Sequence, residues 1–134
     1  SIGHFMDRQV EKGKITQAEM DAAKPRVATG TDMSAFADAD IVIEAAAENE
    51  DIKKAIFKEL CPVLKPEAYI ATNTSSISIT RLAASTDRPG KFVGMHFMNP
   101  VPVMELVEMI RGIATDQETF KTVSTLAEKM GKTL

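Results

Sequence analysis

The sequence has little cysteine, few aromatic residues and no long apolar run. Its single cysteine, Cys61, excludes an internal disulfide and a cysteine-based metal site, and it fits a reducing compartment such as the cytoplasm. No apolar run approaches the roughly 20 residues that a membrane helix needs, and no secretory signal is visible. The net charge of −3 comes without a basic stripe, so neither a nucleic acid nor a membrane is an expected partner.

Two nucleotide-binding motifs are absent as well. The chain has neither a G-x-G-x-x-G after a first strand nor a P-loop, so no motif names a nucleotide. The composition that is present, 44% hydrophobic and 26% charged residues over 134 positions, is typical of one globular domain with a real core.

The hydrophobic pattern alternates between strand and helix periods. Strands are predicted at residues 26–29, 41–47, 69–72, 92–97 and 103–110. Helices are predicted at residues 1–12, 16–24, 51–64 and 79–84, and from residue 115 onward. The alternation predicts an α/β fold with a parallel sheet in one continuous domain.

The pattern also predicts local details of these elements: the position of one strand, the buried face of one helix and the starts of two helices. The run 41–47 is apolar on both faces, which is typical of a central strand. Helical spacing places Ile52 on the buried side of its helix. Capping boxes predict helix starts at Thr16, with Glu19, and at Thr115, with Glu118.

A histidine and a glutamate are predicted to face each other across a hairpin. His96 ends the run 92–97, and Glu108 lies in the run 103–110. The two-proline turn between the runs is too short for a helical crossover, so the runs should pair antiparallel. Both residues lie six positions from Pro102, which places them opposite each other. A carboxylate beside an imidazole suits a general base, although a structural histidine beside a solvated glutamate is the alternative.

Polar clusters follow three successive predicted strands. They comprise Glu48-Asn49, residues 73–76, and residues 96–99. Ligands of open parallel sheets bind beyond the carboxyl ends of the strands. Each cluster alone is explained by the preference of Asn, Ser and Thr for loops, but their recurrence at one edge favours a site.

Three stretches carry a resemblance to a known family. They are residues 43–49, IEAAAEN, residues 73–79, NTSSISI, and residues 96–108, HFMNPVPVMELVE. In these motifs, their order and their spacing, the chain resembles the NAD-binding domain of 3-hydroxyacyl-CoA dehydrogenases, particularly those of the bacterial 3-hydroxybutyryl-CoA type. The resemblance implies a partial Rossmann-type doubly wound parallel sheet with an antiparallel hairpin at its end, lacking the first βαβ unit.

The resemblance also implies roles for individual residues. His96 is expected to be the general base, Glu108 its carboxylate partner, and Ser75 a hydrogen-bond donor to the substrate oxygen. The residues expected to contact NAD are Ala45, Glu48, Lys53, Asn73 and Asn99. No metal is expected. The implied reaction oxidises a 3-hydroxyacyl-CoA, of short chain length, to the 3-ketoacyl-CoA.

The chain departs from the family at both ends. The glycine-rich fingerprint would precede residue 1, and a C-terminal helical dimerisation domain would follow residue 134, so residues 1–134 are interpreted as a partial NAD-binding domain. The intact family member is expected to be a dimer. Residues 1–134 alone are expected to bind NAD weakly and to turn over little substrate. They are also expected to self-associate through an exposed sheet edge. Two alternatives are a truncated, non-catalytic binding or scaffold protein and another Rossmann dehydrogenase acting on a 3-hydroxy acid.

Overall fold

The structure, a computed structural model, describes residues 16–134 and divides the chain into two compact units, residues 1–32 and 33–134. The helix predicted at residues 1–12 lies outside the described residues. In the first unit, helix α2 spans Gln17–Ala23. Thr16 Oγ1 accepts from the Glu19 amide, and the Glu19 carboxylate accepts from the Thr16 amide, so the predicted capping box is confirmed.

The strand predicted at residues 26–29 is wrong. Pro25 lies in a 3₁₀ turn, η1 (Lys24–Arg26), and residues 27–29 have no regular structure. No strand of the described chain pairs with them. A short β-prone run without a partner does not form a strand, because its backbone groups gain no ladder.

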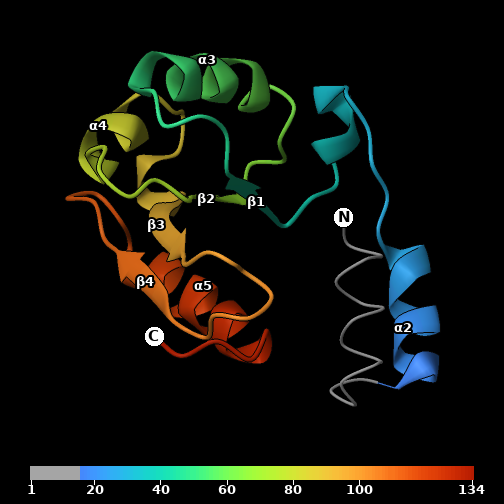
Figure 1. Cartoon of the computed structure of the whole chain (residues 1–134). Coiled ribbons are helices and arrows are strands. Elements are labelled where there is room, and N and C mark those ends of the chain that lie inside the picture. Colours follow the sequence, from blue (N-terminus) through green and yellow to red (C-terminus); the bar gives the residue numbers. More distant parts are fainter. Residues whose placement is uncertain (1–15) are drawn as a thin grey trace. The chain divides into compact units, whose positions relative to one another are not determined.

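The second unit contains a four-stranded sheet (Figure 1). Its strands are β1 (Ile41–Glu44), β2 (Tyr69–Thr72), β3 (Phe92–Phe97) and β4 (Val107–Ile110), in that spatial order. The first three run parallel, and β4 runs antiparallel to β3. The predicted α/β fold with a closing antiparallel hairpin is confirmed.

Strand β1 differs from its prediction in length and in position. It ends at Glu44, and it is the edge strand of the described sheet rather than a central one. The Glu44 carboxylate accepts from the Ala46 amide at 2.7 Å, which turns the backbone out of the ladder. The apolar residues at 45–47 therefore lie in an exposed loop.

Helices cover both faces of the sheet. Helices α3 (Glu50–Leu60) and α4 (Ile79–Ala84) lie on one side, and α5 (Gln117–Lys129) lies on the other (Figure 1). Asn49 and Ser78 cap the N-termini of α3 and α4, because the side chain of each accepts a hydrogen bond from a backbone amide of its helix. Two further 3₁₀ turns, η2 (Met33–Phe36) and η3 (Pro89–Lys91), precede β1 and β3.

The buried side of α3 is rotated by one residue from its prediction. Ile52 is 45% exposed, whereas its neighbour Lys53 is 1% exposed. Phe57 and Leu60 complete the buried face. The hydrophobic pattern could not show this rotation, because burial of a lysine depends on a carboxylate from another element.

The capping box predicted at Thr115 is also wrong. Helix α5 begins at Gln117, after Asp116. Thr115 Oγ1 instead donates to the Phe92 carbonyl and accepts from the Gly112 amide, both at 2.8 Å. Thr115 therefore ties the start of β3 to the loop after β4. The helix ends at Lys129, and Gly131 follows two residues later with a φ of 81°, which favours glycine.

Two apolar clusters hold these layers together. On the α3–α4 side, Phe57 meets Phe92 edge to face, with ring centroids 5.2 Å apart. On the α5 side, Val93 and Met95 of β3 pack with Val123 and Ala127. Alternate residues of β3 thus serve opposite cores, as a strand covered on both faces requires.

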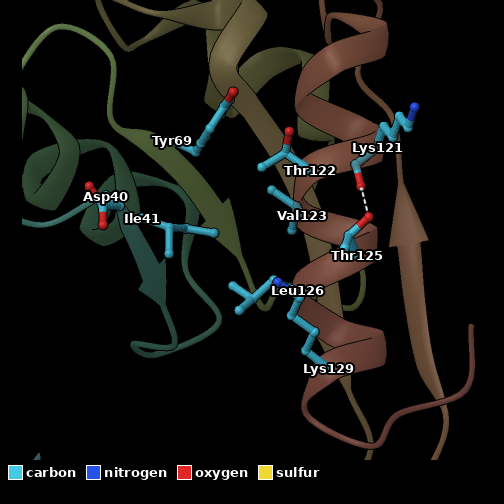
Figure 2. A pocket seen from close by; sticks show the side chains of 9 residues that line it. All are labelled: Asp40, Ile41, Tyr69, Lys121, Thr122, Val123, Thr125, Leu126 and Lys129. Carbon is cyan, nitrogen blue, oxygen red and sulfur yellow. Dashed lines mark hydrogen bonds between the residues drawn. The ribbon is translucent and has the colours of Figure 1, made fainter.

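A groove of about 490 Å³ lies where α5 passes the amino ends of β1 and β2 (Figure 2). Its walls include Ile41, Tyr69, Val123 and Leu126. The polar clusters predicted as a site lie at the other, carboxyl ends of these strands. In the part of the chain that the structure describes, no helix is long and apolar enough to cross a membrane.

Candidate active site

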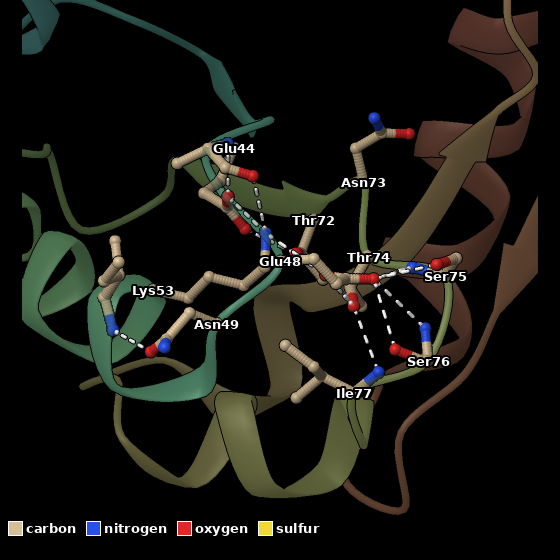
Figure 3. A network of polar contacts seen from close by, with 12 residues as sticks. Glu44, Glu48, Asn49, Lys53, Thr72, Asn73, Thr74, Ser75, Ser76 and Ile77 are labelled. Carbon is tan, nitrogen blue, oxygen red and sulfur yellow. Dashed lines mark hydrogen bonds and ion pairs between the residues drawn. The ribbon is translucent and has the colours of Figure 1, made fainter.

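Glu48 ties together the loops that follow β1 and β2 (Figure 3). Its carboxylate accepts from Thr74 Oγ1 at 2.7 Å, from the Ser75 amide at 2.7 Å and from Ser75 Oγ at 2.8 Å. The amide and hydroxyl of Ser76 add longer bonds of 3.3 and 3.4 Å. Two of the three polar clusters predicted from the sequence are therefore in direct contact.

These contacts keep Glu48 ionised. Partial burial by itself raises the pKa of the Glu48 carboxyl, but the hydrogen bonds from Thr74 and Ser75 and the charge of Lys53 outweigh it. The pKa falls from 4.5 to about 2. A fixed negative charge thus stands at the carboxyl edge of the sheet at every physiological pH.

Lys53 lies behind Glu48. Its Nζ is 2.7 Å from Glu44 Oε2, 3.3 Å from the Ala46 carbonyl oxygen and 3.7 Å from Glu48 Oε1. Glu44 also accepts from Thr72 Oγ1 at 2.6 Å. The lysine predicted to contact NAD is therefore held by two carboxylates, and its side chain is buried.

Asn73 joins the loop after β2 to the end of β3. Its side-chain Oδ1 accepts a hydrogen bond from the Phe97 backbone amide at 2.7 Å, and its backbone amide donates to the Glu44 backbone carbonyl at 2.8 Å. The side chain points away from the Glu48 cluster (Figure 3). Asn73 therefore connects all three parallel strands at their carboxyl ends.

His96 and Glu108 are opposite each other in the β3–β4 ladder, as the hairpin argument predicts. His96 Nδ1 lies 3.7 Å from Glu108 Oε2, and the two side chains are 22% and 53% exposed. Both side chains are therefore partly accessible to solvent. The predicted second strand is shorter than expected, because residues 103–106 stay outside the ladder.

Ala45 and Asn99 occupy exposed loop positions, the first after β1 and the second after β3. Both lie at the carboxyl edge, beside the residues already described. Ser75 Oγ donates to Glu48, so in this structure its proton is already engaged.

Three contributors to this edge received no role of their own from the sequence, although Thr74 lies in the predicted cluster 73–76. Glu44, Thr72 and Thr74 build the network that holds Lys53 and Glu48. Glu44 gave a usable signal, because a charged residue inside the apolar run 41–47 is unusual. Thr72 gave none, since threonine is common in strands, and Thr74 was predicted only as one member of the polar cluster 73–76.

The described residues 16–134 contain no group of three or more His, Cys, Asp or Glu side chains arranged to hold a metal ion. Cys61 is buried, and burial raises the pKa of its thiol. The chemistry of this edge rests on a carboxylate cluster, hydroxyl donors and one imidazole. A mainly parallel sheet, covered by helices on both faces and with a polar cluster at the carboxyl ends of its strands, is the arrangement of a Rossmann-like α/β fold.

Comparisons with known proteins give the family. Residues 1–134 match the family described as 3-hydroxyacyl-CoA dehydrogenase, NAD binding domain. A 3-hydroxybutyryl-CoA dehydrogenase of Bradyrhizobium diazoefficiens is 56% identical over 132 residues, which is 98% of this chain and 45% of the relative.

Two solved structures agree. The (S)-3-hydroxybutyryl-CoA dehydrogenase of Ralstonia eutropha superimposes with a TM-score of 0.91 at 47% identity, covering 95% of this chain and 45% of the other. The 3-hydroxybutyryl-CoA dehydrogenase of Escherichia coli K12 gives a TM-score of 0.93 at 42% identity, covering 98% and 28%. The chain belongs to the NAD-binding domain family of 3-hydroxyacyl-CoA dehydrogenases, and it spans less than half the length of these relatives.

Proposed function

We propose that the chain forms part of an enzyme that oxidises a short-chain 3-hydroxyacyl-CoA to the 3-ketoacyl-CoA and passes hydride to NAD. The observation that carries the proposal is the pairing of His96 with Glu108 at the sheet edge where Glu48 meets Ser75. The names of the relatives support the substrate class. We also propose that this enzyme is cytoplasmic, forms a homodimer and binds an acyl-CoA substrate.

His96 acts as the general base. Its Nδ1 faces Glu108, which leaves Nε2 to take the proton of the substrate hydroxyl. An imidazolium forms as the ketone forms, and the Glu108 carboxylate stabilises that cation. The antiparallel ladder fixes the separation of the two groups, because both are carried by paired strands.

Ser75 is the proposed donor to the substrate oxygen, whose negative charge grows in the transition state. Its position at the Glu48 cluster places the hydroxyl at the same sheet edge as His96. To donate to the substrate, Ser75 must turn its proton away from Glu48. Rotation about one side-chain bond achieves this, while the Ser75 amide keeps its own bond to Glu48.

The residues at this edge fit a dinucleotide. Glu48 offers carboxylate oxygens to ribose hydroxyls, and Ala45 presents only a methyl group, which leaves room for close approach. The side chains of Asn73 and Asn99 offer amides, while Lys53 contributes its charge from behind Glu48. NAD, when bound, supplies the hydride acceptor.

The test is an assay of the protein at its natural length with 3-hydroxybutyryl-CoA and NAD. His96→Gln is expected to lower kcat by about 10²- to 10⁴-fold, because it removes the base. Glu108→Gln is expected to lower kcat only about fivefold, since an ion pair with one half-exposed partner contributes no more than about 1 kcal/mol.

Glu105→Gln is the matched control for Glu108→Gln, because Glu105 is an exposed glutamate outside the β4 ladder. It is expected to leave kcat unchanged. The proposal fails if the unmodified protein does not turn over 3-hydroxyacyl-CoA, or if His96→Gln retains full activity.

A further inference from the structure

Glu44 is the most deeply buried carboxylate at the candidate edge, and the proposed reaction gives it no role. It is 5% exposed and ends strand β1. Oε1 accepts from Thr72 Oγ1 at 2.6 Å, and Oε2 accepts from the Ala46 amide and from Lys53 Nζ, each at 2.7 Å. Donors from β2, from the following loop and from α3 therefore converge on one carboxylate.

Lys53 needs this carboxylate. Lys53 is 1% exposed, and burying an ammonium group without a partner to replace the lost water is costly. Glu44 is the near partner at 2.7 Å, and Glu48 is the far one at 3.7 Å. The ammonium thus stands between a buried carboxylate and an exposed one, and its position depends on the pull of both.

Glu48 in turn is balanced between two sets of donors. On one side are Thr74, Ser75 and Ser76, which hold its carboxylate at 2.7 to 3.4 Å. On the other side is Lys53. Without Glu44, the lysine's strongest remaining partner among the described residues is Glu48, and a move toward it draws that carboxylate away from the serine loop.

We propose that Glu44 is a positioning residue for cofactor binding, which acts by holding Lys53 back so that Glu48 stays against the Ser75–Ser76 loop. Glu44 itself does not touch the cofactor, because it is buried beneath Lys53 and the loop at Ala46. This inference rests on the proposed function, in which Glu48 contacts the cofactor ribose.

The experiment measures NADH binding by fluorescence, together with steady-state kinetics, in the protein at its natural length. Glu44→Gln keeps the shape of the side chain and removes its charge. We expect the Kd of NADH and the KM of NAD to rise about tenfold, the size expected for losing a hydrogen bond to a charged group. The KM of the acyl-CoA should change less than about twofold on the same scale.

A double-mutant cycle tests the route through Lys53. Lys53→Met removes the group that would draw Glu48 away, so Glu44→Gln should weaken NADH binding in the unmodified background but not in the Lys53→Met background. Glu59→Gln makes the same chemical change on the exposed face of α3 and serves as the control. Thr72→Val removes one hydroxyl that holds Glu44 and should raise the same Kd by about threefold, so the proposal can still be tested if Glu44→Gln does not fold.

A purely structural role predicts something else. The proposal is overturned if Glu44→Gln or Thr72→Val lowers the Tm but leaves the Kd of NADH unchanged, or if the effects of Glu44→Gln and Lys53→Met simply add. NADH binding needs no acyl-CoA turnover. If the unmodified protein binds NADH but does not oxidise 3-hydroxyacyl-CoA, the proposed substrate fails and the role of Glu44 is still tested.

Discussion

At the scale of single residues, the two glutamates at the sheet edge, Glu44 and Glu48, differ in the groups that bind their carboxylates. Glu48 is held by neutral donors of the neighbouring loop, whereas Glu44 is held chiefly by a buried ammonium. The neutral donors do not cancel the charge of Glu48, and its only charged partner among the described residues, Lys53, lies farther away at 3.7 Å. The opposite charges of Glu44 and Lys53 nearly cancel, so this pair fixes the local structure and adds little to the electrostatic potential at the edge.

The pKa of Glu48 makes the stability of the fold depend on pH in a defined window. The pKa is about 2 in the folded chain, below the ordinary value of 4.5. The stabilisation is therefore fully present above about 4.5 and is lost as the pH falls toward about 2. Glu48→Gln lacks this contribution, so the difference in free energy of unfolding from the unmodified chain should shrink between pH 5 and pH 2. Urea denaturation at pH 7 and pH 3 measures it, and an equal difference at both pH values would contradict the prediction.

Glu44 shows what sequence reasoning misses at this scale. The hydrophobic run 41–47 predicted a buried strand, and residues 41–44 do form a strand, in which Val42 and Glu44 are buried and Ile43 is exposed. That a glutamate within it pairs with a lysine nine positions later depends on how α3 packs back on the sheet. Helical spacing alone placed Ile52 inward, because it counts apolar residues and cannot recognise a buried ion pair.

At the scale of elements, β3 organises the site. It supplies His96, it pairs with both β2 and β4, and its alternate residues pack into both cores. Gly94 lies at a close contact between β3, α4 and β4. A Cβ at this position would lie 2.8 Å from Ile79 Cδ1 and 2.9 Å from Ile110 Cβ. The close approach lets the start of α4, and with it the loop that carries Ser75, lie directly on the sheet.

Gly94→Ala is therefore expected to lower the free energy of unfolding by about 1–3 kcal/mol, as for overpacking in a core. Gly30→Ala is the matched control, because nothing lies within 4 Å of a Cβ at that position. Thermal or urea denaturation of both variants checks the prediction. Equal stability of the two variants would show that Ile79 and Ile110 adjust without cost.

The hairpin was the element that the sequence predicted best. The facing of His96 and Glu108 follows from counting residues on either side of Pro102, and the register confirms it. A local turn links the two strands, so nothing distant can change the count. The contact of Glu48 with residues 74–76 joins parts of the chain 26 to 28 positions apart, and only the general rule on carboxyl ends of parallel strands predicted their proximity.

At the scale of the whole molecule, β1 is an edge strand of the sheet that residues 16–134 form, and Ile43 is exposed on one of its faces. A strand edge with unpaired backbone groups is a template for pairing with another chain. A chain limited to these 134 residues is expected to self-associate, and Ile43→Lys to reduce that association by placing a charge on the exposed face. Light scattering over a range of concentrations measures both chains. A monodisperse monomer of the unmodified chain would contradict the prediction.

The tie between Glu48 and the serine loop has a thermodynamic consequence. If Glu48 binds the cofactor ribose as proposed, the ribose hydroxyls and the donors of residues 74–76 share the same two carboxylate oxygens. A ribose hydroxyl on this carboxylate then weakens the bond from Ser75 Oγ, whose proton becomes available to the substrate oxygen, while the Ser75 amide still holds Glu48 against the loop. Each ligand therefore changes the affinity for the other by the same factor, since such coupling is reciprocal. A single glutamate, shared between two loops, is enough to make two binding events depend on each other.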